Sequence, residues 1–186
     1  LITTRHGQTP EVLRSIRRNE PIRDIVDWPH SGTLGLAKGQ GGEDDGYVYT
    51  DYNTVVNAFH YAAVSRLADM YEAIGRKAEA KELTAYAREF RRTFCHAFLD
   101  KERGIFVDGI GTDHASLHAN MFAAAFGLVP EQHRATVAAH IKSRGMACSV
   151  YGAQFLLEAL YDLGEPDAAL SLMTSQSDRS WANMIR

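Results

Sequence analysis

Apolar residues recur at steps of three and four along most of the chain after residue 52, and this spacing predicts helices. One such stripe is made of Val56, Phe59, Ala63, Leu67, Met70 and Ile74. The same register assigns the opposite, polar side to Asn57, Arg66, Asp69 and Glu72. A second stripe follows after a short connection and contains Leu83, Ala87, Phe90, Phe94 and Phe98. So short a connection predicts an antiparallel pair of helices over residues 53–98.

Three glycines in the helical part of the chain mark predicted helix ends: Gly75, Gly127 and Gly164. Glycine suits the left-handed position that follows a helix, and the prolines at 130 and 166 suit the start of the next one. These corners predict further antiparallel hairpins over residues 115–174. The expected fold class is therefore all-α.

Two other stretches have the residue composition of loops. Residues 99–113 combine glycines with short β-branched runs, which predicts a small ribbon or a long loop. Residues 1–52 are also expected to be largely loop, with 39–46 as the most flexible part. Long loops in a helical domain are commonly functional. We therefore expect a single domain over 1–186, with a loop-rich pocket segment at 1–52 and helical hairpins at 53–186.

Within the loop-rich segment, the pair Asp27-Trp28 is the clearest candidate for a binding site. A sugar can stack its apolar face on an indole while its hydroxyls donate to a carboxylate. The alternative is a capped turn, in which Asp27 bonds its own backbone and Trp28 fills the edge of a core. Both interpretations stay open on these residues alone.

Composition excludes several classes of partner. The net charge is -3 and no Lys and Arg run is interleaved with aromatics, so nucleic acid is not an expected partner. No apolar run reaches the length of a membrane span, so no membrane partner is expected.

The chain opens at Leu1 without Met or a signal sequence, which indicates a fragment of a longer protein. Cys95 and Cys148 lack metal-ligand spacing and are expected to be buried free thiols.

Three smaller groups of residues carry side chains that are used in metal binding or catalysis. The acids at 43–45 could hold a cation, but they lack the alternating ligands of a calcium loop, which favours a solvated loop. His114 and His118 stand four apart and could share a helical face for zinc, yet no third ligand follows. A substrate hydrogen bond or a satisfied core histidine is favoured, and no metal or cofactor is predicted. Ser31 and Ser149 have no nucleophile-elbow context, which disfavours acyl transfer.

Four segments, in this order, resemble the catalytic domain of bacterial α-L-rhamnosidases: Arg23 to Pro29, Ala115 to Pro130, Ser143 to Gly152, and Ser177 to Trp181. The resemblance implies an (α/α) six-hairpin toroid and an inverting glycosidase that releases terminal L-rhamnose. The segment containing Asp27 and Trp28 resembles the family's Gly-Asp-Trp segment, whose acid and indole line the sugar pocket. Here Val26 replaces that glycine. Trp181 resembles the tryptophan of the family's Ser-Trp segment.

The resemblance also implies a set of site residues. We expect the carbohydrate substrate, a rhamnoside, to be bound by Asp27, Trp28, His30, His118, Tyr151 and Trp181. No catalytic residue is assigned, because the family takes its acid from an upstream Arg-Asp-Glu segment and its base from a downstream Trp-Glu segment. The chain is thus expected to be the middle of a catalytic domain, with little turnover alone. Apolar faces exposed by the missing parts of a ring would favour self-association as a homo-oligomer.

Two alternatives remain at this point. Residues 67–75, followed by an Ala-rich helix, read like one tetratricopeptide unit and suggest a helical-repeat scaffold for binding proteins. The three corner glycines are spaced by 52 and 37 residues, whereas such an array holds near 34. The glycosidase interpretation is therefore preferred. An α-toroid glycosidase with another sugar specificity also stays open.

Overall fold

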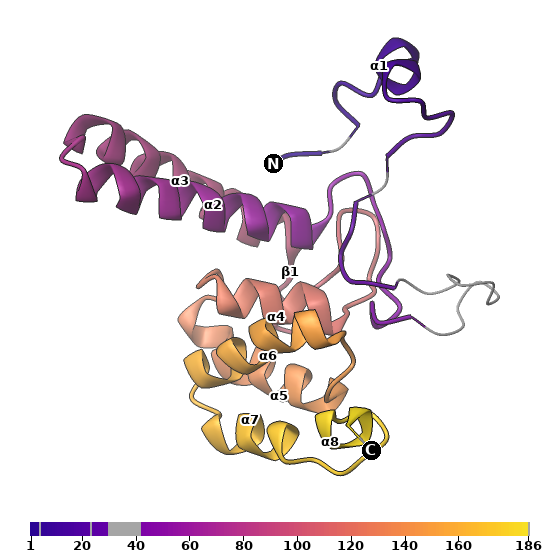
Figure 1. Ribbon diagram of the computed structural model, residues 1–186. Coiled ribbons are helices and arrows are strands. Elements are labelled where there is room, and N and C mark those ends of the chain that lie inside the picture. Colours follow the sequence, from indigo (N-terminus) through magenta and orange to yellow (C-terminus); the bar gives the residue numbers. More distant parts are fainter. Residues whose placement is uncertain (4, 23, 30–41, 186) are drawn as a thin grey trace.

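A computed structural model describes residues 1–3, 5–22, 24–29 and 42–185. Most of the described chain is helical, as predicted. Its elements are α1 (Pro10–Ser15), α2 (Thr54–Ala73), α3 (Lys77–Phe98), β1 (Leu99–Asp100), β2 (Ile105–Phe106), α4 (Leu117–Ala125), the short 3-10 helix η1 (Glu131–His133), α5 (Arg134–Arg144), α6 (Val150–Asp162), α7 (Pro166–Met173) and α8 (Trp181–Met184). Figure 1 shows α2 and α3 side by side as a long hairpin, with α4 to α8 stacked below it. Among the described helices, none combines the length and apolarity needed to cross a membrane.

The hairpin of α2 and α3 forms as the sequence predicts. The Asn53 side chain caps α2 by accepting a hydrogen bond from the Val56 backbone N–H at 2.9 Å. Gly75 follows α2 with a φ of +80°, a conformation that a side chain disfavours, and so turns the chain into α3. In α3 the predicted stripe is buried through Ala87, Phe90, Phe94 and Phe98.

The buried face of α2 differs from the prediction. Met70 and Ile74 of the predicted apolar stripe are 63% and 69% exposed. Asn57, predicted to be on the polar side, is fully buried. Its side-chain oxygen accepts from the Ile2 N–H at 2.8 Å and its amide donates to the Ile2 carbonyl at 3.1 Å. The buried face of α2 therefore carries Asn57, which contacts the first residues of the chain, and mostly small side chains. Part of the predicted apolar stripe is left exposed.

The predicted ribbon and corners are confirmed. Strands β1 and β2 pair antiparallel, with Leu99 opposite Phe106 and Asp100 opposite Ile105. The corner glycines after α4 and α6 have φ values of +71° and +84°, which fits the left-handed position expected of them. The described residues before 53 are largely loop, as predicted, apart from the six residues of α1. The predicted flexible segment at 39–46 is described only from residue 42 onward.

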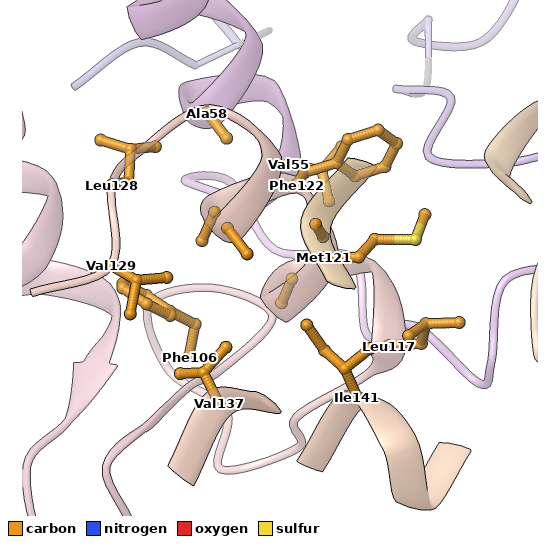
Figure 2. Packing of buried hydrophobic residues seen from close by; sticks show 14 of the residues in the cluster. Val55, Ala58, Phe106, Leu117, Met121, Phe122, Leu128, Val129, Val137 and Ile141 are labelled. Atoms are coloured by element: carbon orange, nitrogen blue, oxygen red, sulfur yellow. The ribbon is translucent and has the colours of Figure 1, made fainter. Parts of the chain in front are cut away.

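Helix α4 is the centre of the core. Every residue from Leu117 to Ala124 is buried, as expected of a helix with packing partners on all sides. Figure 2 shows the side chains that meet here from α2, α4, α5 and the ribbon; they include Val55, Ala58, Phe106, Met121, Phe122, Val137 and Ile141. Residues carried by α4 are therefore held in a rigid frame.

A buried carboxylate joins the first part of the chain to this core. Asp108 follows β2, is fully buried, and accepts hydrogen bonds from the Val48 N–H and the Ser116 N–H, both at 2.9 Å. His114 Nδ1 lies 2.5 Å from the same carboxylate. The Tyr47 hydroxyl donates to the Asp108 carbonyl at 2.6 Å. These contacts hold the segment around residue 48 against the start of α4.

Candidate sugar-binding site

Asp27 lies behind the candidate site rather than in its opening. Its side chain is only 3% exposed, and each oxygen accepts two hydrogen bonds. Oδ1 accepts from the Trp28 N–H at 2.8 Å and from the Ser149 hydroxyl at 2.5 Å. Oδ2 accepts from His118 Nε2 at 2.9 Å and from the Ser149 N–H at 2.9 Å. A carboxylate has about four acceptor sites. No acceptor therefore remains for a direct bond from a sugar hydroxyl.

The partners of Asp27 come from the starts of two helices. His118 is the second residue of α4, and Ser149 caps α6 by accepting from the Gly152 N–H at 3.0 Å. Gly152 allows the close approach, because a Cβ there would lie 2.7 Å from Asp27 Oδ2. The Asp27 carboxylate thus fixes the loop that presents Trp28 against both helices.

The charge on Asp27 is stabilised by these contacts. Burial raises the pKa of this carboxyl, but the hydrogen bonds from His118 and Ser149 outweigh burial and leave the pKa below its usual value. His118 is fully buried, and its Nδ1 has no hydrogen-bond partner among the described residues. This assigns the ring proton to Nε2, where it bonds the carboxylate. The Ser149 hydroxyl donates to Asp27 and not to a histidine, so the group is not a nucleophilic triad.

A cavity of about 370 Å³ opens in front of this cluster, within the size range of small-ligand pockets. Trp28 and Trp181 both line it, although they are far apart in the sequence. Trp28 is 58% exposed, and Trp181 is the first residue of α8. The walls also contain Ser149 and Val150 at the start of α6, and the cavity is lined by the charged residues Glu43, Asp178 and Arg179.

Arg179 ties together three segments of the cavity wall. Its Nε donates to the Met146 carbonyl at 2.9 Å, and its guanidinium also contacts the Cys148 carbonyl at 3.4 Å. The same guanidinium forms an ion pair with Glu43. These partners precede Arg179 by 31 to 136 residues in the sequence. Arg179 therefore holds the C-terminal turn against the other walls of the cavity.

The acidic loop at 43–45 is not solvated, contrary to the prediction. Glu43 pairs with Arg179, and Asp45 pairs with Arg144. The Asp45 carboxylate also accepts from the backbone N–H of Leu117 at 2.7 Å. The acids are therefore used to join this loop to α4, α5 and the C-terminal turn. Acidic residues in a loop predict solvation only when no cation packs against them, and the two arginines lie 99 and 136 residues away in the sequence.

A second, apolar hollow of about 670 Å³ lies beside the cavity and shares Trp28 with it. Tyr151 lines this hollow and is 75% exposed. Other lining residues come from the loop around Asp27 and from α2, including Ile25, Val56 and Phe59. Tyr151 therefore faces a neighbouring surface and does not line the cavity between the two indoles.

Comparison with known families gives one match that covers nearly the whole chain. The bacterial alpha-L-rhamnosidase 6 hairpin glycosidase domain matches residues 7–186. The chain belongs to this family. The predicted fold class, an all-α six-hairpin glycosidase domain, is thereby confirmed, in agreement with the helical structure. A comparison with curated protein sequences gave no match.

The rhamnosidase-type domain brings together most of the residues predicted for the site. Asp27, Trp28 and His118 form one cluster, and Trp181 shares the cavity with Trp28. The predicted site residue His30 lies outside the described residues, and so does Ser31, which the sequence disfavoured as a nucleophile. The zinc arrangement is not formed, because His114 precedes α4 and contacts Asp108, whereas His118 contacts Asp27.

Sequence reasoning missed Ser149 and Arg179 as parts of the site in this rhamnosidase-type domain. Ser149 could have been found as a helix cap, because serine is favoured immediately before a helix. That signal would not have revealed its bonds to Asp27, which is 122 residues away. For Arg179 no local pattern indicates its partners.

The two thiols of the domain are expected to resist modification in the native state. Burial, with the nearby Asp27 charge as a further cause, raises the pKa of Cys148 to about 12, and burial also raises the pKa of Cys95. Reaction needs the thiolate, whose population at Cys148 falls on the order of a thousandfold. Labelling with a thiol reagent at pH 8 should be slow for folded protein and complete in denaturant. Rapid labelling of Cys148 in a Cys95→Ser variant that remains folded would contradict this.

Proposed function

We propose that this domain binds a terminal L-rhamnosyl group between Trp28 and Trp181 and serves an α-L-rhamnosidase that hydrolyses the glycoside with inversion. The observation that carries the proposal is the shared cavity of the two indoles, in a domain of a glycosidase family. L-Rhamnose is a 6-deoxy sugar, so it offers a methyl group and apolar ring faces to aromatic side chains. Its hydroxyls require polar groups at the same site.

The roles of the site residues follow from their contacts. The two indoles supply the contact surfaces, and Tyr151 extends the apolar surface next to Trp28 toward the rest of the glycoside. Asp27 and His118 act as positioning residues, because the carboxylate has no free acceptor and the imidazole is buried. Inversion needs an acid and a base held about 6.5–9.5 Å apart. We assign neither role to a residue of the described chain.

The helical-repeat alternative gains no support from the hairpin. A repeat array stacks similar helix pairs one after another. Here the pair formed by α2 and α3 is followed by a ribbon and then by the much shorter helix α4. A glycosidase with another sugar specificity is distinguished by the binding experiments below.

Replacing either tryptophan with alanine should weaken rhamnoside binding. For Trp28→Ala we expect KM for an aryl α-L-rhamnoside and Kd for L-rhamnose to rise about ten- to thirtyfold, since a stacked ring and its apolar contact are lost. Trp181→Ala should have a milder effect, because Trp181 is less exposed than Trp28. Steady-state kinetics and titration calorimetry on the native full-length protein measure both constants, and NMR of the first anomer released tests inversion.

A matched control is Tyr161→Ala, which removes an exposed aromatic residue of α6 that does not line the cavity. This variant should keep parental kinetics. If the tryptophan variants lose thermal stability while their folded fraction keeps the parental KM and Kd, the indoles serve packing and the proposal is wrong.

A further inference from the structure

The cavity contains one acid whose role the contacts above leave unexplained. Asp178 lines the cavity together with both indoles and is solvent-exposed. Its carboxylate forms no hydrogen bond or ion pair with any described residue. Both of its oxygens are therefore available to a ligand.

The other acids near the two indoles are engaged. The Asp27 carboxylate accepts four hydrogen bonds from within the chain, and Glu43 is paired with Arg179. Arg179 is the direct neighbour of Asp178, yet its guanidinium is directed to Glu43 and to the carbonyls of Met146 and Cys148. The nearest arginine in the sequence is thus used elsewhere, and the Asp178 carboxylate has no ion-pair partner among residues 1–3, 5–22, 24–29 and 42–185.

The backbone around Asp178 is held in place rather than left free. The Asn183 side-chain amide donates to the Asp178 carbonyl at 2.9 Å. The Ser180 hydroxyl donates to the Ser177 carbonyl at 2.5 Å, and the same hydroxyl caps α8 by accepting from the Asn183 N–H. Asp178 and Trp181 are therefore presented by one short, internally bonded turn. A carboxylate on a well-held backbone next to an aromatic ring can recognise a sugar by its hydroxyls and its apolar face.

We propose that Asp178 accepts hydrogen bonds from two adjacent hydroxyls of the bound sugar, and that Trp28 and Trp181 contact its apolar parts. This assignment rests on the proposed function, because it places the sugar in the same cavity. It also defines the substrate class: a neutral deoxy sugar fits, whereas a sugar acid would bring a second negative charge to an unpaired carboxylate. Asp178 is a binding residue here and has no assigned part in proton transfer.

The test compares Asp178→Asn and Asp178→Ala with the parental protein. Hydrogen bonds to a charged group predict a ten- to hundredfold rise in Kd for L-rhamnose in both variants. The parental protein should also lose affinity for an analogue of L-rhamnose that lacks one of the contacted hydroxyls. The Asp178→Ala variant should bind L-rhamnose and that analogue equally. Melting temperature should change little, because the carboxylate has no partner among the described residues.

Asp113→Asn is the matched control, since Asp113 is exposed, has no side-chain partner among the described residues and does not line the cavity. It should bind L-rhamnose as the parental protein does. If Asp178 variants bind normally while the tryptophan variants bind weakly, the Asp178 assignment is wrong and the proposed function stands. If another neutral sugar binds in place of L-rhamnose and still depends on Asp178, the assignment stands and the rhamnoside proposal fails. If no sugar binds the parental protein, both are overturned.

Discussion

Asp27→Ala should lower the free energy of unfolding by about 3–5 kcal/mol. Its removal leaves the Trp28 N–H, the Ser149 N–H and hydroxyl, and His118 Nε2–H without their acceptor in a buried place. The folded fraction should also bind L-rhamnose more weakly, because the loop carrying Trp28 is no longer fixed to α4 and α6. Urea denaturation followed by circular dichroism measures the first effect, and titration calorimetry at low temperature measures the second.

The same carboxylate predicts a pH dependence with a defined sign. The pKa of Asp27 in the folded chain lies below its usual value of 3.8, so its contribution to stability is fully present above that pH. The contribution should be lost as the pH falls through the lower pKa of the folded state. Asp27→Asn lacks this titration, so its stability deficit relative to the parental protein should shrink on acidification below about pH 4. A constant deficit from pH 6 to pH 2 would contradict the assignment.

A loss of about 3–5 kcal/mol is also expected for Asp108→Ala, although Asp108 does not line the cavity. This fully buried carboxylate accepts from the backbone N–H groups of Val48 and Ser116 and contacts His114. Once the acceptor is removed, the two amides lose protection, and hydrogen exchange at Val48 and Ser116 should accelerate strongly. Denaturant titration gives the stability change.

The variants Asp27→Ala and Asp108→Ala serve as experimental controls for each other. Both should be destabilised to a similar extent, but Asp108→Ala should keep the parental Kd for L-rhamnose under conditions in which it is folded. Equal weakening of sugar binding in both variants would show that binding follows global stability and not the position of Trp28. A loss of stability below about 1 kcal/mol in Asp108→Ala would mean that the buried donors find other acceptors.

The helices could be predicted because their signals are local. The stripe of α3 and the corner glycines act over a few residues, and the structure confirms them. The buried face of α2 could not be predicted in the same way. A period of 3.6 indicates an amphipathic helix, but the face that becomes buried depends on what packs against it. Asn57 is hydrogen-bonded to Ile2, which is 55 residues away, and no residue near Asn57 in the sequence indicates this contact.

The candidate site was predictable in its residue types but not in its connections. An acid beside an indole suggested a sugar contact, and family resemblance added Trp181. That Asp27 is saturated by His118 and Ser149 depends on contacts across 91 and 122 residues. Such contacts have no periodic or compositional signal. They leave the Asp27 carboxylate without a free acceptor, which is why we propose Asp178, and not Asp27, as the residue that contacts the sugar hydroxyls.

The bonds that build the cavity wall also determine when it can form during folding. The ion pair between Glu43 and Arg179 spans 136 residues, and the bonds of Asp27 to Ser149 span 122. The hairpin of α2 and α3, by contrast, is built from neighbours in the chain. Closing a long loop carries an entropic cost that local contacts avoid. The helical hairpins can therefore assemble while the chain ends are still apart, and the cavity lined by Trp28 and Trp181 is completed only when the first and last thirds of the chain have met.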